Sequence, residues 1–253
     1  MAVDLNADVG EGMDDAALLP FLTSANVACG LHAGDPTVMD ATVEQALARG
    51  VRVGAHPGYP DRENFGRIRM DMPPAAIERL VLYQIAALDG FVRSRGARLA
   101  HVKPHGALYH AAAQSRDVAR AVAAGVRRAG SDLVVVGQPG TKMLEAAREA
   151  GLPVAAEAFA DRRYRPDGTL VSRTEAGALL TDPEEAAAQA LSLARDRCVL
   201  AQDGSRIGVE ADTICVHGDT PGVPEIARRI RERLASEGIV VSAPEPRPRE
   251  SVK

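Results

Sequence analysis

Carboxylate, imidazole and amine side chains recur directly after the β-rich runs of the sequence and seldom interrupt its helical patterns. Such groups serve as general acids and bases and as ligands for substrates or metals. In parallel α/β folds the C-terminal ends of the strands form one rim, where active sites lie. The sequence therefore predicts an enzyme with one pocket at this rim. The residues concerned are Asn6, Asp8, Glu11, His32, Asp35, His56, Lys103, His105, Glu157, Asp161, His217 and Asp219.

The spacing along the strands places several of these groups on a common face. Residues two apart on an extended strand point to the same side. If those faces line the mouth of a barrel, carboxylates, imidazoles and one amine surround a common pocket. The groups with this spacing are Asn6 and Asp8, then His101, Lys103 and His105, then His217 and Asp219.

Each residue also has a purely structural explanation. Asp35 precedes a proline at a helix start, which favours a role as helix cap. His101 lies in mid-strand and is expected to be a hydrogen-bonded core residue, whereas His110 is expected on an exposed turn or helix start. A buried lysine without a purpose is rare, so we expect Lys103 and its neighbour His105, in the run Lys-Pro-His-Gly, to be functional.

The three cysteines are too few and too widely spaced for a disulfide framework, and none forms a CxxC pair. A reducing cytosol is therefore the expected location. Cys29 lies three residues before His32, so its thiol could lie near a base, but a small buried packing residue is the commoner case. We interpret Cys198 and Cys215 as packing residues.

A metal site is an open alternative at the predicted rim. Imidazole and carboxylate groups suit Zn²⁺, Mn²⁺ or Fe²⁺. A divalent metal, if present, would be held by Asp8, His32, His56 and His105, with His217 nearby. The chain has no HExxH motif. A metal-free site, in which the same groups act as acids, bases and substrate ligands, is at least equally expected.

Two long connections, 57–74 and 159–180, carry clustered arginines. Loops of this length in a compact domain are usually functional, so we expect them to act as lids. Arginine recognises carboxylate or phosphate through paired hydrogen bonds, which indicates an anionic ligand. The sequence contains no Walker A motif.

The elements that must position these groups alternate between short β-rich runs and longer helical patterns. This alternation predicts parallel strands joined by right-handed crossovers. Seven strands favour a closed or nearly closed barrel, with a doubly wound sheet as the alternative. Helices are expected to start at Asp35-Pro36 and Asp182-Pro183. The predicted strands are 3–9, 23–29, 51–56, 99–103, 133–136, 153–157 and 213–217.

The chain is expected to form one barrel domain over residues 1–242. Residues 199–209, with Asp203-Gly204 at their centre, predict a β-hairpin inserted before the last strand. The segment 243–253 is charged and rich in proline, so we expect it to be disordered.

The composition is that of an ordinary soluble protein, with 46% hydrophobic and 25% charged residues among 253. A net charge of −4 gives no electrostatic reason to expect nucleic acid or an anionic membrane as partner. No run approaches the roughly 20 apolar residues that span a membrane, and no signal peptide is apparent. A cytoplasmic protein is predicted, with its oligomeric state, a homo-oligomer included, left open.

A series of blocks, in order along nearly the whole chain, resembles the LamB/YcsF family. Such an ordered series is far more specific than any one motif. The stretch after the first block is shorter than is usual in the family, and residues 64–69 differ from its usual Gly-Phe-Gly-Arg-Arg. The blocks are DLNADVGE (4–11), SANVACGLHAGDP (24–36), GAHPGYPD (54–61), HVKPHGALY (101–109), FADRRY (159–164) and CVHGD (215–219).

This resemblance implies a distorted seven-stranded β/α barrel related to the glycoside hydrolase and deacetylase barrels. It also implies ATP-coupled conversion of 5-oxoproline to L-glutamate, in a complex with B and C subunits that bind or share the ATP. An unstrained five-membered lactam resists hydrolysis, and phosphorylation of its carbonyl oxygen would make it a far better electrophile.

We hypothesise that Lys103 offsets negative charge on a phosphate or on the developing oxyanion, and that Asp8 or a neighbouring histidine is the general base. Arg162 would hold a substrate carboxylate. A stand-alone metal-dependent deacetylase or amidohydrolase, and a non-catalytic substrate-binding subunit, are the two competing functions. The predicted catalytic residues are Asp8, His32, His56, Lys103, His105 and His217, and the predicted substrate-binding residues are Asn6, Glu11, Asp61, Arg162 and Asp219.

Overall fold

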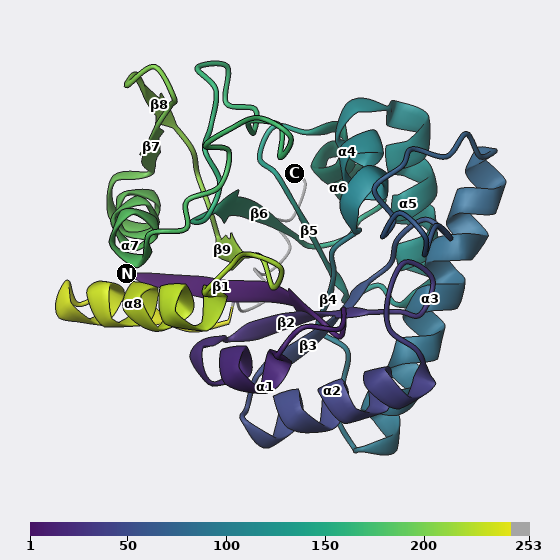
Figure 1. Cartoon of the computed structure of the whole chain (residues 1–253). Helices are drawn as coiled ribbons and strands as arrows, with labels where there is room; N and C mark the ends of the chain where they lie inside the picture. Colours follow the sequence, from purple (N-terminus) through teal and green to yellow (C-terminus); the bar gives the residue numbers. More distant parts are fainter. Residues whose placement is uncertain (244–253) are drawn as a thin grey trace, which may run out of the picture.

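Seven parallel strands close into a barrel in the computed structural model, which describes residues 1–243 (Figure 1). The barrel order is β1-β2-β3-β4-β5-β6-β9, and β9 closes it by pairing with both β6 and β1. The predicted seven-stranded barrel is confirmed, and the doubly wound alternative is wrong. The strands are β1 (Ala2–Val9), β2 (Ser24–Ala28), β3 (Arg52–His56), β4 (His101–Val102), β5 (Val134–Gly137), β6 (Val154–Phe159) and β9 (Thr213–Val216).

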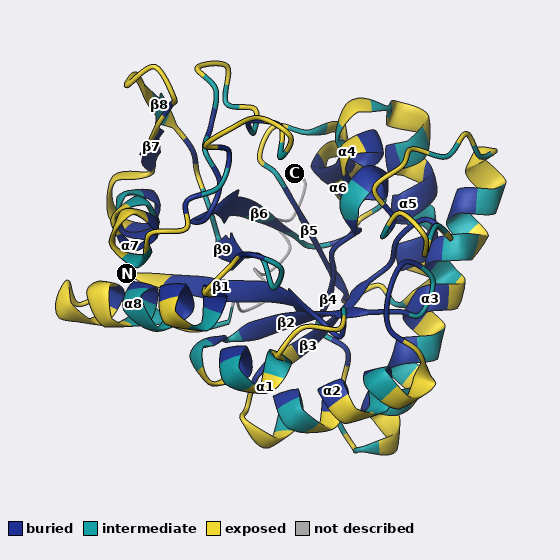
Figure 2. Cartoon of the chain, viewed as in Figure 1, coloured by how far each residue is buried: buried dark blue, intermediate teal, exposed yellow. Residues whose placement is uncertain are grey.

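Helices surround the barrel and turn their apolar faces towards it, as the dark inner sides in Figure 2 show. The predicted caps are confirmed: the side chains of Asp35 and Asp182 accept hydrogen bonds from backbone N–H groups in the first turns of α2 and α7. The helices are α1 (Asp15–Leu18), α2 (Pro36–Ala48), α3 (Pro74–Ser94), α4 (Gly106–Gln114), α5 (Arg116–Ala129), α6 (Lys142–Glu149), α7 (Pro183–Leu191) and α8 (Val223–Ser236), with short helical turns at Leu19–Phe21 and Ser192–Asp196.

In the described part of the chain, three short strands lie outside the barrel. The predicted hairpin is confirmed as β7 (Cys198–Leu200) and β8 (Arg206–Gly208), which pair antiparallel. The strand β10 (Val240–Val241) was not predicted, because two residues are too short to show a period. It pairs with the first residues of β1, just before β9 begins to pair with that strand.

The interior of the barrel is polar below the pocket, where a ladder of hydrogen bonds runs along β1. Thr213 Oγ1 donates to Asp4, and the amide of Asn6 donates to Thr213 Oγ1 at 2.6 Å. The amide of Asn26 then donates to Asn6 Oδ1 at 2.8 Å and to Asp8 Oδ1 at 2.9 Å. This ladder fixes the position of the Asp8 carboxylate at the top of the strand, since every member is buried.

The predicted disorder of the tail concerns residues that, from position 244 onward, lie outside the described part of the chain. Among the described residues, no helix is long and apolar enough to cross a membrane.

Candidate active site

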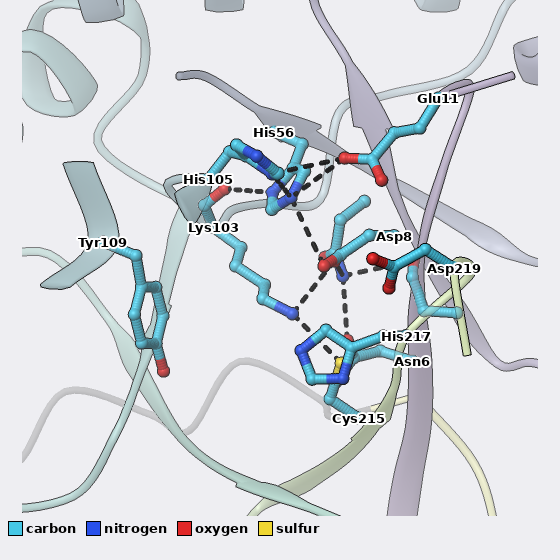
Figure 3. Close-up of polar contacts among 12 residues, drawn as sticks. Asn6, Asp8, Glu11, His56, Lys103, His105, Tyr109, Cys215, His217 and Asp219 are labelled. Atoms are coloured by element: carbon cyan, nitrogen blue, oxygen red, sulfur yellow. Dashed lines mark hydrogen bonds and ion pairs between the residues drawn. The ribbon is translucent and has the colours of Figure 1, made fainter. Parts of the chain in front are cut away.

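A cavity of about 330 Å³ opens at the C-terminal ends of the strands, on the predicted rim. Its size is at the lower end of the range of roughly 300–1,000 Å³ found for small-molecule sites. Figure 3 shows acidic and basic side chains from different strands converging there. The predicted site residues that line it are Asp8, Glu11, His56, Lys103, His105, Arg162, His217 and Asp219.

Lys103 lies at the floor of the cavity, at the end of β4, with its side chain only 4% exposed. Its Nζ lies 3.0 Å from Asp8 Oδ1, 2.8 Å from Glu157 Oε1 and 3.1 Å from Cys215 Sγ. Burial lowers the pKa of Lys103, but the negative charges around it outweigh burial and raise the pKa well above its ordinary value. The ammonium group is therefore charged at neutral pH.

Asp8 joins this cation to the histidines at the end of β1. Its Oδ2 lies 3.4 Å from His56 Nε2. Burial raises the pKa of Asp8, but the opposite charges of His56 and Lys103 outweigh burial and hold the pKa well below its usual range. Asp8 is thus an ionised carboxylate that faces both a lysine and an imidazole.

Glu11 gathers three imidazoles around one carboxylate oxygen. Its Oε1 lies 3.2 Å from His32 Nε2, 3.2 Å from His105 Nδ1 and 3.7 Å from His56 Nε2. Burial raises the pKa of Glu11, but the hydrogen bonds with His105 and His32 outweigh burial and lower the pKa to about 2. Three of these four residues were predicted to be catalytic, and Glu11 was predicted to bind substrate.

His32 is brought to this cluster but does not line the cavity. Its ring stacks on that of His105, with centroids 3.9 Å apart and planes 4° from parallel. Burial is the main reason that its pKa falls to about 4, so this imidazole is neutral at neutral pH. His32 can therefore affect the cavity only through its contacts with Glu11 and His105.

His217 approaches the cavity from β9 and is held by Asp161. The Asp161 carboxylate accepts the backbone N–H of His217 at 2.9 Å and lies 2.9 Å from its ring Nδ1. Thr220 Oγ1 donates to the same carboxylate at 2.6 Å. Asp161 follows β6, as the sequence indicated, but its pairing with His217 joins segments 56 residues apart and could not be predicted from spacing.

Three arginines from the two long connections reach the cavity. Arg67 Nη2 lies 2.5 Å from Asp219 Oδ2, and Arg173 Nη1 lies 3.0 and 2.9 Å from the two oxygens of the same carboxylate. Arg162 donates to the backbone carbonyl of Val171, and its buried Nε has no partner among the described residues. Asp219 therefore ties both loops together, which its sequence position did not reveal.

Two predicted substrate-binding residues lie away from the cavity lining. Asn6 is part of the ladder inside the barrel, one step below Asp8. Asp61 accepts from the backbone and side chain of Asn64 and so stabilises a turn in the first long loop. Both residues are near the ends of strands in the sequence. The pleat of β1 directs Asn6 into the barrel, and Asp61 is held by a local turn.

Other residues belong to the site although they were not among its predicted members. Tyr109 donates to Glu157 Oε2 at 3.0 Å, which orients this carboxylate beside Lys103. Cys215 was interpreted as a packing residue, yet its sulfur contacts the lysine ammonium. Cys29 is buried, and burial raises its pKa to about 12, as a packing residue requires.

His101 and His110 are the two histidines that were expected to have structural positions and no catalytic role. His101 is buried and its Nε2 is 2.7 Å from Asn26 Oδ1, so it supports the ladder from the side. His110 is exposed, as expected, but it lies within α4 and not at its start, and it lines the cavity. Among residues 1–243, donor atoms that could hold a metal lie within 4.8 Å of one another in two groups: Glu11, His32, His56 and His105, and Asp8, Cys215 and His217.

Comparison with known proteins identifies the relatives of this chain. A protein from Methylococcus capsulatus, named as the A subunit of 5-oxoprolinase, is 51% identical over 247 residues, 95% of each chain. One with the same name from Heliobacterium modesticaldum is 47% identical over 249 residues, 96% of this chain and 98% of that one. The crystal structure of a lactam utilization protein from Thermus thermophilus superimposes with a TM-score of 0.91 at 46% identity, and covers 96% and 100% of the two chains. The model of the LamB/YcsF family matches residues 3–248. The chain therefore belongs to the LamB/YcsF family.

Proposed function

We propose that this chain is the A subunit of an ATP-dependent 5-oxoprolinase, which opens 5-oxo-L-proline to L-glutamate as ATP is hydrolysed to ADP and phosphate. The observation that carries the proposal is the Lys103 ammonium group, buried at the floor of a small cavity between two carboxylates. Relatives at about half identity that are named as this subunit of 5-oxoprolinase, and a structural neighbour named for lactam utilization, support it.

The lactam carbonyl requires strong activation, because the ring is unstrained and the amide is resonance-stabilised. ATP would supply a phosphoryl group for the carbonyl oxygen and so make the carbonyl carbon a better electrophile. Lys103 is suited to offset the negative charge that results, since a cation in a dry site acts more strongly than in water. One of the three groups that contact Lys103 Nζ is Cys215 Sγ, which accepts hydrogen bonds only weakly. The ammonium group can therefore redirect this hydrogen bond to an oxyanion on the substrate.

The remaining groups fit the acid–base and binding steps of lactam opening. Asp8 is ionised and can act as the general base. His217, whose Nδ1 is held by Asp161, can transfer a proton through its other ring nitrogen. Arg162 lines the cavity and has an Nε without a partner among the described residues, so it suits the substrate carboxylate.

A name that denotes one subunit implies partners, and we propose that B and C subunits complete the enzyme in the cytoplasm. ATP would be bound by or shared with those partners. The absence of a Walker A motif from this sequence is in keeping with such a division. The charged cavity favours a catalytic subunit over one that only presents substrate.

The test is glutamate release from 5-oxoproline by the purified chain, alone and with its candidate B and C partners, each with and without ATP. The proposal predicts release only when partners and ATP are both present. No release with verified, folded partners would contradict it. Hydrolysis of other amides by the chain alone, lost to a chelator and restored by metal, would favour a stand-alone metal-dependent hydrolase.

A further inference from the structure

Two imidazole nitrogens face each other in the cluster at the cavity wall. His56 Nδ1 lies 2.7 Å from the carbonyl oxygen of Lys103, and His105 Nε2 lies 2.8 Å from that of Phe65. A carbonyl only accepts, so each of these nitrogens carries a hydrogen and leaves the opposite ring nitrogen for another ligand. The opposite nitrogens, His56 Nε2 and His105 Nδ1, are only 3.0 Å apart, and each also faces a carboxylate oxygen, of Asp8 and of Glu11 respectively. A metal ion at this position would be bound by both nitrogens through their lone pairs.

We propose that His56, His105 and Glu11 bind one divalent transition-metal ion at the wall of the cavity (Figure 3). The three donor atoms are His56 Nε2, His105 Nδ1 and Glu11 Oε1. Two imidazoles and one carboxylate form a common three-residue ligand set that leaves further coordination positions open. The proposal concerns binding by this chain alone and does not depend on the reaction proposed above.

The separations between the donor atoms match a metal site. Metal–ligand bonds of about 2.0–2.1 Å in a tetrahedral arrangement place neighbouring ligands about 3.3 Å apart. The observed separations are 3.0 Å between the two imidazole nitrogens, 3.2 Å from His105 to Glu11 and 3.7 Å from His56 to Glu11. Asp8 Oδ2 lies 3.4 Å from His56 Nε2 and borders the same space. Small shifts of these side chains would equalise the distances.

The ring orientations distinguish ligands from supports. An imidazole binds a metal in the plane of its ring, and the rings of His56 and His105 are 89° apart, so one ion can lie in both planes. The ring of His32 is parallel to that of His105 and stacked on it, so an ion in the plane of one lies outside the plane of the other. His32 is therefore a positioning residue, which orients Glu11 through a 3.2 Å contact and supports His105 by stacking.

The surroundings hold both ligand rings in the orientation that a metal needs. Ligand histidines commonly donate their second N–H to a backbone carbonyl, as both do here. Phe65, whose carbonyl orients His105, has a φ of 56°, a left-handed conformation that is costly for a bulky residue. The adjacent Gly66 packs so closely that a Cβ there would come 2.8 Å from His32 and 2.9 Å from His105. The loop is thus built against these rings.

The charge at the site also calls for a cation. The buried carboxylates Asp8, Glu11 and Glu157 belong to one cluster of contacts. Lys103 contacts Asp8 and Glu157, and His56 contacts Asp8 and Glu11. Buried carboxylates need compensating positive charge. A divalent ion bound by the two imidazoles and Glu11 would supply this charge. Nitrogen and oxygen donors suit Zn²⁺, Mn²⁺, Fe²⁺ or Co²⁺.

The test is metal binding by the purified, chelator-treated chain, titrated with Zn²⁺ against a competing indicator and with Co²⁺ by visible absorption. The expected result is one ion per chain, with affinity at least about 100-fold lower in His56→Ala, His105→Ala and the isosteric Glu11→Gln. His32→Gln should lower affinity about 10–100-fold but keep the shape of the Co²⁺ spectrum, since it removes only support. Glu175→Gln, which makes the same change at an exposed carboxylate outside the cavity lining, is the matched control for Glu11→Gln and should bind like the wild type.

Circular dichroism melts would check that each variant is folded. If an alanine variant does not fold, the isosteric Glu11→Gln still tests the proposal. No saturable binding by the folded wild type would overturn the proposal, and a proton shared between His56 and His105 would then explain the short distance. Affinity that survives in His56→Ala and Glu11→Gln but falls in Cys215→Ser would also overturn it, because the ion would then occupy the neighbouring group.

Discussion

At the scale of single residues, the cavity keeps buried charges by setting each beside an opposite partner. Lys103 lies between Asp8 and Glu157, and Asp161 holds His217. A buried charge without a partner costs several kcal/mol, so removing one member destabilises the other. The charge state of each group therefore depends on its neighbour as much as on its own chemistry.

Asp161→Asn tests whether His217 must be oriented to act. The asparagine amide keeps the size of the side chain but offers one acceptor oxygen for the two His217 donors. We expect kcat of the assembled enzyme to fall about 100-fold or more, with KM changed only a few-fold. Asp167→Asn, an exposed aspartate on the same loop, is the control and should leave both constants unchanged. Wild-type kcat in Asp161→Asn would show that His217 orientation is unimportant.

The three cysteines should differ in reactivity, because the thiolate is the reactive form. Burial raises the pKa of Cys29 to about 12 and that of Cys215 well above its ordinary value, whereas hydrogen bonds with Ser192 and Arg206 lower that of Cys198. Iodoacetamide at about pH 8 should modify Cys198 first, as peptide mass mapping would show, and all three residues in urea. Faster modification of Cys215 in the folded chain would mean that the cavity floor is open.

At the scale of elements, the two long loops meet over the cavity through one carboxylate. Asp219→Ala should free Arg67 and Arg173, raise KM for substrate about 10-fold and change kcat less, because the loops close the cavity without touching the reacting atoms. Hydrogen exchange of residues 57–73 and 160–180 should become faster. Glu175→Gln, which weakens an exposed pair with Arg165 in the second loop, is the control. Unchanged exchange in Asp219→Ala would exclude the clamp.

The start of α1 contains a carboxyl group that should make stability depend on pH. Burial raises the pKa of Asp15 to about 6, although its Oδ2 accepts the Gly10 N–H at 2.7 Å. The folded state therefore holds this proton up to about pH 6, whereas the unfolded chain releases it near pH 4, so the free energy of unfolding falls as pH rises through this window. Urea unfolding should show that Asp15→Asn removes up to about 3 kcal/mol of this fall.

Asp14→Asn is the matched control for that experiment, because Asp14 is exposed and asparagine also caps helices well. It should leave the pH dependence as it is in the wild type. A free energy of unfolding that falls equally in Asp15→Asn would place the titrating group elsewhere.

At the scale of the whole molecule, the barrel strands could be predicted because each is a short β-rich run between turn signals or helical patterns. The closed barrel was predicted from the number of strands, but the addition of β10 to β1 could not be, since it depends on a pairing between the two ends of the chain. The rim residues could be predicted for the same reason as the strands, because parallel strands end at one edge. Local patterns therefore predict the elements better than their long-range pairing.

The contacts within the site depend on that long-range packing. The sequence placed Lys103 and His105 at the rim, but it did not show that Glu157 and Cys215 surround the ammonium group. It placed Asp61 among the binding residues, although a local turn engages that carboxylate. Residue types and spacing indicate which side chains can react, and the packing of distant segments decides which of them meet.

The proposal that the cavity around Lys103 opens 5-oxoproline is tested most directly by glutamate release from the complex with B and C partners and ATP. Lys103→Met should reduce release about 1,000-fold or more, because the neutral side chain cannot offset charge at the carbonyl oxygen. Lys142→Met changes an exposed lysine whose Nζ donates to the Gln114 carbonyl, and it should release glutamate at the wild-type rate. Full release by a folded Lys103→Met complex would contradict the account and place the reaction outside this cavity.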